Sequence, residues 1–353
     1  MTASTSIVAD ARAAAQMLGR HPHDHGWREI YRVIAHAFAD SSSALAPVAH
    51  EFRALRAFDS DSHFLTLLGI AIRAVAPDIL PRLGIDDDLD KRMSILDRAV
   101  RHHEAHIRRL VLHRRNSFTS ARRFLVPQVL LSAYFAAATA PVRFADLGTG
   151  LGILPRELNS AAVFDRFAGD LPWPDGVPRF RPIPLAARFG VDRGPLPDFA
   201  WVRACHGVSP YYDRLFDELL LAFELTEPTA AGVRYDEVDL LDGDRLTGFL
   251  RGGAIGVANL SYVLYELRPE TRLEIIEAAL DAMASPGVVV VTEPHDELAG
   301  AGCTVTVYGH HHDPLRVLDV SDGHFRGQVR PGPDYDAFLA RFRVAFDAGA
   351  SRP

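Results

Sequence analysis

The chain has 353 residues, with 38 Lys and Arg against 45 Asp and Glu, a formal charge of −7. This length allows about two domains with a sizeable core, and 48% hydrophobic residues is ordinary for a globular protein. The mild acidity argues against nucleic acid as the main partner, and no apolar run reaches the roughly 18 residues that cross a membrane. The first residues lack the basic and apolar regions of an export signal, so we expect a cytoplasmic protein. Two cysteines, Cys205 and Cys303, imply neither a disulfide framework nor a metal site.

Residues 6–138 have helical periodicity and almost no strand signal. The longest helix is expected to begin near 86–88, where three aspartates suit the positive pole of a helix. Its apolar stripe follows steps of three and four along Met93, Leu96, Val100, His103, Ile107 and Leu110. We therefore predict an N-terminal helical domain over 1–115, which forms a lid or one wall of a substrate site, and a second domain over 116–353.

Histidines gather at two places, His102, His103 and His106 on the long helix and His310, His311 and His312 in a predicted turn. His102 and His103 lie about 100° apart on a helix, and adjacent loop residues seldom converge on one ion. We predict no metal site, although the sequence leaves metal binding by these clusters open. A His103 that faces a substrate pocket is the alternative interpretation.

The second part alternates strands and helices. After a helix over 116–138, strands are predicted at 142–145, 187–192, 233–238, 254–258 and 287–291, with a helix over 199–223 between the second and third strands. A hairpin of 304–308 and 315–320 follows the last strand. This order predicts an α/β fold with a Rossmann-like, mostly parallel sheet and an antiparallel C-terminal hairpin.

The motif D-L-G-T-G-L-G, from Asp146 to Gly152, directly follows the first strand. Glycines at alternate positions let the backbone bend tightly and leave room for a ligand. The dinucleotide fingerprint G-x-G-x-x-G needs its third glycine one residue later than Gly152, so the motif does not match it. No lysine follows the glycines, which excludes a phosphate-binding P-loop.

D-x-G-x-G-x-G resembles the first motif of the class I S-adenosylmethionine-dependent methyltransferases, in which the turn passes under the methionine part of the cofactor. The resemblance implies S-adenosylmethionine as cofactor and a class I methyltransferase sheet. It also implies cofactor-binding roles for Asp146, Gly148, Thr149, Gly150 and Gly152. In that family the helix before the first strand often covers the cofactor, which makes Ser117, Thr119 and Arg122 ligand candidates.

Other segments resemble a family of uncharacterised bacterial proteins, defined only as a domain of unknown function, that pairs a helical N-terminal region with such a core. The matching segments are 120–127, 144–154, 189–195, 201–203 and 261–268. This second resemblance implies no substrate. The glycine turn of this chain is closer to that of the methyltransferases, which favours cofactor binding.

The methyltransferase resemblance further implies an acid at the end of the second strand that holds two ribose hydroxyls, which suits a carboxylate because it accepts two hydrogen bonds. Asp192 ends an apolar run at 187–191, whereas Asp165 and Asp170, at the more usual spacing, follow no convincing strand. We choose Asp192 over Asp170.

Two more strand ends supply candidates. By the same resemblance, Asp239 and Leu240, after the third strand, match positions that bind the adenine. Asn259 and Tyr262 follow the fourth strand, at the edge where ligands bind in such sheets.

Methyl transfer is an in-line displacement in which the protein supplies alignment and, for an oxygen or nitrogen nucleophile, a base. Glu266, Glu293 and His295 are the candidate bases, and Tyr262 and Tyr265 are candidates to orient the substrate. We predict a methyltransferase that acts on a small-molecule acceptor by O- or N-methylation, in secondary metabolism. Two alternatives stay open: an enzyme that uses the sulfonium without methylating, as in a cyclisation, and an inactive binding or scaffold protein. The acceptor and the oligomeric state, a homodimer included, are also left open.

Overall fold

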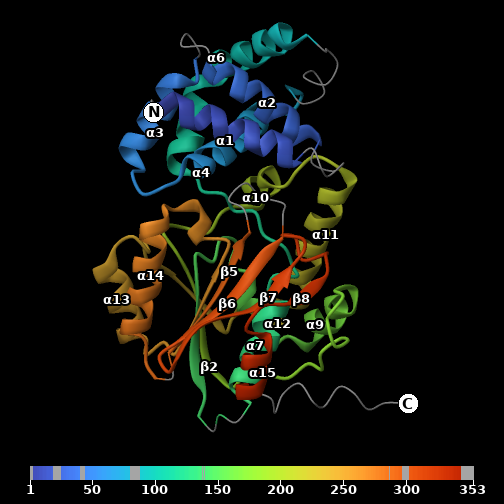
Figure 1. Cartoon of the computed structure of the whole chain (residues 1–353), viewed down its shortest axis with the longest axis vertical. Helices are drawn as coiled ribbons and strands as arrows, with labels where there is room; N and C mark the ends of the chain where they lie inside the picture. The colour runs from blue at the N-terminus through green and yellow to red at the C-terminus, as the bar shows by residue number, and fades with distance from the viewer. Residues whose placement is uncertain are drawn as a thin grey trace.

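The computed structural model describes residues 3–18, 25–39, 44–79, 88–136, 138, 140–285, 287–295 and 302–342. A group of helices from the N-terminal third of the chain lies at one end of a twisted sheet whose two faces are covered by further helices (Figure 1). Within these ranges, no helix combines the length and the hydropathy needed to cross a bilayer.

The N-terminal group contains α1 (Ala3–Leu18), α2 (His25–Ala39), α3 (Ala46–Leu55), α4 (Asp61–Val75) and α6 (Leu89–His113). Helix α4 is its centre, because almost every side chain from Ser62 to Arg73 is buried. The Oγ of Ser60 caps α4 by accepting from the His63 amide. In α6, Leu96, Val100, Ile107 and Leu110 of the predicted apolar stripe are buried in the same core, whereas Met93 and His103 are half-buried. Asp88 caps α6, whereas Asp86 and Asp87 lie outside the described residues.

The sheet has eight strands in the order β3-β2-β1-β4-β5-β6-β7-β8. Strands β1 to β5 are parallel, and β6, β7 and β8 continue antiparallel. Their bounds are β1 (Val142–Leu147), β2 (Leu185–Asp192), β3 (Val233–Glu237), β4 (Val257–Ser261), β5 (Val288–Pro294), β6 (Cys303–Gly309), β7 (His312–Val320) and β8 (Val329–Pro331). The predicted fold class, a Rossmann-like and mostly parallel sheet with antiparallel C-terminal strands behind a helical region, is confirmed; β8 was not predicted.

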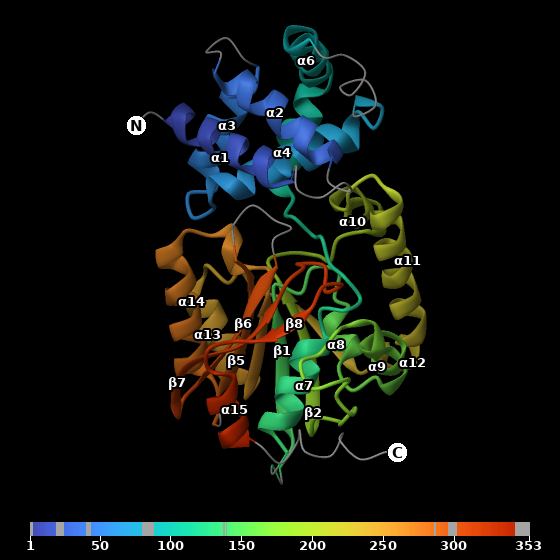
Figure 2. The same ribbon diagram turned by 45° about the vertical axis from the view of Figure 1, so that its right-hand side comes forward.

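Alternate side chains of the strands point to opposite faces of the sheet, and each face has its own hydrophobic core. Phe144 of β1 and Val257 of β4 face one core, and their neighbours Ala145 and Ala258 face the other. The Phe144 face is covered by α7 (Leu125–Tyr134), α8 (Leu154–Glu157), α9 (Ala161–Phe167), α11 (Pro210–Leu225) and α15 (Tyr335–Phe342); α12 (Glu227–Ala230) lies on the same side (Figure 2). The opposite face is covered by α13 (Gly243–Gly252) and α14 (Pro269–Ala282).

Two predicted helices are shorter than expected. The helix predicted over 116–138 begins only at Leu125, because the preceding segment runs along α10 (Phe199–Cys205), where Trp201 Nε1 donates to the Arg115 carbonyl at 2.9 Å. The helix predicted over 199–223 is divided into α10 and α11, and Ser209 caps the second part.

The helical group and the sheet are joined by backbone hydrogen bonds. Asp59 forms an isolated bridge with Leu267, and the Ser60 amide donates to the Glu266 carbonyl at 2.8 Å. Trp201 and Cys205 of α10 are buried in the helical core. The predicted boundary at 115/116 falls in the extended segment between α6 and α7.

His206, at the end of α10, gives a measurable pH dependence. It is fully buried, its Nδ1 donates to the Val202 carbonyl at 2.9 Å, and burial lowers its pKa from 6.5 to about 4. As the pH falls, the unfolded chain therefore binds the proton first, and this stability is present above pH 6.5 and lost towards pH 4. The slope of the unfolding free energy against pH, measured by urea unfolding in this window, reports the number of protons taken up on unfolding. In His206→Gln that number should be smaller than in wild type by up to about one. The exposed control His50→Gln should keep the wild-type slope, and equal slopes in both variants would refute the assignment.

Candidate functional site

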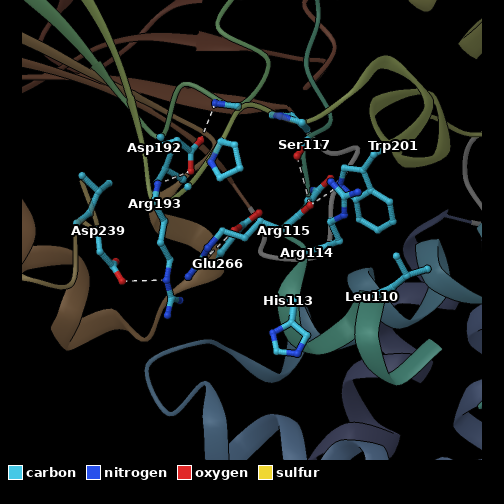
Figure 3. A pocket seen from close by; sticks show the side chains of 18 of the residues that line it. Leu110, His113, Arg114, Arg115, Ser117, Asp192, Arg193, Trp201, Asp239 and Glu266 are labelled. Atoms are coloured by element: carbon cyan, nitrogen blue, oxygen red, sulfur yellow. Dashed lines mark hydrogen bonds and ion pairs between the residues drawn. The ribbon is translucent and has the colours of Figure 1, made fainter. Parts of the chain in front are cut away.

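A cavity of 860 Å³ lies between the carboxyl ends of the parallel strands and the C-terminal end of α6. On the sheet side it is lined by Gly148, Gly150, Asp192 and Asp239, and on the helical side by residues that include Leu110 and His113 (Figure 3). The strand order reverses between β1 and β4, which makes this edge the place where open α/β sheets bind ligands.

The glycine turn forms the floor of this cavity. Gly148 has a φ of +77°, and a Cβ on it would lie 2.5 Å from Val263 Cγ2, so both conformation and packing require glycine. Gly150 has a φ of +54°, and a Cβ on it would meet nothing within 4 Å. Its amide donates to Asp192 Oδ2 at 2.8 Å. The turn is thus tied to the end of β2 and keeps an open side towards the cavity.

Asp192 and Asp239 line the cavity on the same side as the glycine turn. The second oxygen of Asp192 accepts from the Arg193 amide at 2.8 Å, and burial raises the pKa of its carboxyl. Asp239 pairs with Arg193 Nε at 2.9 Å, and Leu240 lines the cavity beside it. Asp170 instead lies on the short 3-10 helix η2 (Ala168–Asp170), where it accepts from Arg122 outside the cavity.

A second, small cavity of 50 Å³ continues beneath the turn and shares Asn116, Ser117, Gly148, Gly150 and Tyr262 with the large one. Asp146 lies in it, buried, with one oxygen accepting from Asn259 Nδ2 and the other from Thr149 Oγ1, both at 2.8 Å. Burial raises the pKa of Asp146 to about 6, against these two hydrogen bonds. Asn259 and Thr149 therefore hold a buried carboxyl beside the turn.

Arg123 lines the same small cavity and was missed by the sequence analysis. Its buried guanidinium lies 3.9 Å above the centre of the Tyr262 ring and donates from Nη1 to the Phe118 carbonyl at 3.1 Å. Among the residues that the structure describes, no carboxylate forms an ion pair with it. Burial lowers the pKa of Arg123 because nothing nearby compensates the charge fully. The predicted Arg122 is not in the cavity, because its guanidinium pairs with Glu218 and Asp170 at 2.9 Å.

The loop after β4 forms another part of the wall. Tyr262 has a φ of +57°, which is uncommon for a residue other than glycine and marks a backbone held in place by its surroundings. The Glu293 carboxylate fixes the backbone of this loop, because it accepts hydrogen bonds from the amides of Val263, Leu264 and Tyr265 at 2.9–3.0 Å. Both Tyr262 and Val263 line the large cavity.

The candidate base Glu293 is engaged by the three amides of the loop after β4 and does not line the large cavity, and the other predicted catalytic residues lie in different places. Glu266, in the short 3-10 helix η3 (Leu264–Glu266), lines the large cavity. Tyr265 is buried and accepts from Asn116 Nδ2 at 2.9 Å, and it is not part of the lining. His295 is exposed beyond β5, 3.2 Å from Asp319 and outside the cavity.

Glu266 is held by a buried cluster that reaches into the helical group. His63 Nδ1 lies 3.3 Å from Glu266 Oε1, and His63 Nε2 lies 3.0 Å from Arg56 Nη2. A guanidinium can only donate, so Nε2 accepts and the proton of the neutral ring lies on Nδ1, whose 3.3 Å approach to Glu266 lacks the geometry of a hydrogen bond. Arg115 lies 3.9 Å from both Glu266 and Asp59, and Asp59 pairs with Arg56. Burial raises the pKa of Glu266 well above its ordinary value, and Arg115 opposes the shift.

In the described part of the chain, no group of three or more His, Cys, Asp or Glu is arranged so that it could hold a metal ion. His310 bonds to the Leu280 carbonyl, and His312 donates to the Asp313 carbonyl at 2.7 Å. His106 is the member of the other cluster that lines the large cavity.

No protein-family model and no curated protein matches the chain. One similar solved structure bears the description "PigF with SAH", with 18% identity and a TM-score of 0.25 over 72% of this chain and 57% of that chain. Another is an O-methyltransferase family protein from Burkholderia thailandensis, with 14% identity and a TM-score of 0.29 over 79% of this chain and 67% of that chain. The chain thus spans little more than half the length of the first and about two thirds of the second. These likenesses concern the fold alone.

Proposed function

We propose that the two connected cavities bind S-adenosylmethionine and that the protein transfers its methyl group to a small molecule. The observation that carries the proposal is that Asp146 and Arg123 both line the small cavity while neither forms a salt bridge with the other. A buried guanidinium without a carboxylate partner is costly, and so is a buried carboxyl that lacks a cation. A zwitterionic amino-acid group supplies both missing charges on one carbon atom.

The remaining parts of the cofactor fit the large cavity. With the amino-acid end between Asp146 and Arg123, the nucleoside extends over Gly150 towards Asp192 and Asp239. Each oxygen of Asp192 accepts one backbone hydrogen bond and keeps a further lone pair for a ribose hydroxyl. The open side of Gly150 leaves space for this passage. Asp239 and Leu240 are then the residues that meet the adenine.

When bound, the cofactor supplies an electrophilic methyl carbon, and the chain supplies position and a base. Glu266 is the base we favour, because of the three candidates it alone lines the cavity. A base works best when its pKa is close to the working pH, and burial shifts Glu266 in that direction. His63 and Arg115 hold its carboxylate at the cavity wall, where it can take the proton of an acceptor hydroxyl or amine.

The helical region over 1–115 is proposed as the second wall of the acceptor site. Leu110 and Trp201 give the wall apolar surface on the side away from Asp239 (Figure 3). The space left beside the cofactor suits a small organic molecule. A role in secondary metabolism is part of the same proposal.

Calorimetric titration with S-adenosylmethionine and S-adenosylhomocysteine tests the proposal. Wild type should bind both with micromolar affinity, and Asp192→Ala should bind about 10- to 100-fold more weakly, because two hydrogen bonds to a carboxylate are lost. Asp170→Ala is the matched control, since it removes an acid outside the cavity and should bind like wild type. Folded wild-type protein that binds neither ligand would contradict the proposal and favour the scaffold alternative.

A further inference from the structure

The last two turns of α6 present one face to the large cavity. His106, Arg109, Leu110 and His113 all line it, at the spacing of three, four and seven residues that brings side chains together on a helix. Three of these four side chains carry nitrogen atoms that can donate hydrogen bonds. This face is therefore built for polar contact with something in the cavity.

Arg109 differs from the other arginines around the cavity. Arg193 pairs with Asp239 at 2.9 Å, Arg114 with Asp198 at 3.5 Å, and Arg115 lies between Asp59 and Glu266. Its neighbour Arg108, which points away from the cavity, pairs with Glu51. For Arg109, the described part of the chain provides no acidic partner.

The acids of the cavity do not compensate Arg109. Asp192 and Asp239 lie on the far side, across the opening from His113 and Leu110 (Figure 3). Glu266 is the acid on the near side, and its carboxylate lies 3.3 Å from His63 and 3.9 Å from Arg115. The α6 wall thus carries positive charge that faces the space left for the acceptor.

We propose that the methyl acceptor is an organic anion whose carboxylate is bound by Arg109, with His106 and His113 beside it. A guanidinium binds a carboxylate through two parallel hydrogen bonds, which fixes the orientation as well as the position of the ligand. Leu110 and the indole of Trp201 pack against the apolar body of the acceptor and suit a flat ring. This inference rests on the proposed function, because it assigns the substrate class of the same site.

The test compares hydroxylated aromatic carboxylates with their uncharged carboxamides. The probes are 4-hydroxybenzoate, 3,4-dihydroxybenzoate and 4-hydroxycinnamate, each titrated beside its amide into protein saturated with S-adenosylhomocysteine. At least one carboxylate should bind wild type about tenfold more tightly than its amide, which corresponds to about 1.4 kcal/mol. In Arg109→Gln the preference for the carboxylate over the amide should fall below about threefold, because the guanidinium that binds the carboxylate is missing.

Arg108→Gln is the matched control, since it makes the same change one residue away and off the cavity. It should keep the tenfold preference. Equal binding of acid and amide by wild type, no binding of any carboxylate, or equal loss in both variants would overturn the inference. The first titration, with S-adenosylhomocysteine alone, reports on the proposed function separately. If that ligand fails to bind, the probes are titrated into the protein alone, where an Arg109-dependent preference for carboxylates would establish an anion site but refute its role as acceptor site.

Discussion

Replacing Arg123 with methionine should weaken the binding of S-adenosylhomocysteine by about 100-fold, or about 2.7 kcal/mol, because truncating one partner of a buried charge pair costs that order of energy. The binding of 5′-methylthioadenosine should change less than about threefold, since that ligand keeps the nucleoside but has no amino-acid group for the guanidinium to hold. Calorimetry with both ligands measures the difference. The comparison isolates the charge contact from any general loosening of the site.

The stability of the Arg123→Met protein provides the control for this experiment. Arg123 is buried without a carboxylate partner, so its removal should leave the unfolding midpoint unchanged or raise it. Arg123→Lys keeps the charge but not the paired donors, and its loss of affinity should be intermediate. Equal loss of both ligands, or of neither, would mean that Arg123 does not bind the carboxylate of the amino-acid group.

Gly148→Ala and Gly150→Ala should separate the structural and binding roles of the glycine turn. Both residues have positive φ, which costs roughly 1–2 kcal/mol for alanine. At Gly148 the new Cβ would also lie 2.5 Å from Val263, so the free energy of unfolding should fall by about 3 kcal/mol or more. At Gly150 the Cβ meets nothing, so only the conformational cost remains.

The free energy of unfolding tests the packing of Gly148, whereas ligand affinity tests the open side of Gly150. Because the open side of Gly150 faces the cavity, its new methyl group should lower the affinity for S-adenosylhomocysteine at least tenfold although the protein stays folded. Urea unfolding and calorimetry on the same samples measure both quantities. Equal destabilisation by the two substitutions would contradict the role of Val263, and unchanged affinity in Gly150→Ala would contradict passage of the ligand over this residue.

The parts of the fold that the sequence predicted depend on local patterns. In the run that ends at Asp192, Phe189 and Val191 are two residues apart and both pack in the same core, as the period of a strand requires. The run pairs with β1, and its end falls at the sheet edge where Asp192 lines the cavity. Asp170 follows a helical segment, so of the two acids it is Asp192 that ends a strand of the sheet. The ligand roles of both acids stay predictions.

The missed parts depend on contacts between distant segments. Arg122 and Arg123 are adjacent and chemically identical in the sequence, and only the turn before α7 decides that Arg123 faces the cavity while Arg122 meets Glu218. His63 and Glu266 are brought together by the bridge between Asp59 and Leu267, which no local pattern indicates. His295 follows a strand end, as the sequence suggested, but the loop carries it towards Asp319 and away from the cavity.

The position of S-adenosylhomocysteine in a crystal of the complex tests the account most directly. We predict its carboxylate at Arg123, its ammonium at Asp146, its ribose hydroxyls at Asp192 and its thioether sulfur facing the space bounded by Glu266 and Arg109. A ligand bound elsewhere, or one whose amino-acid group lies away from both Asp146 and Arg123, would contradict the central claim that these two buried charges are the cofactor's partners.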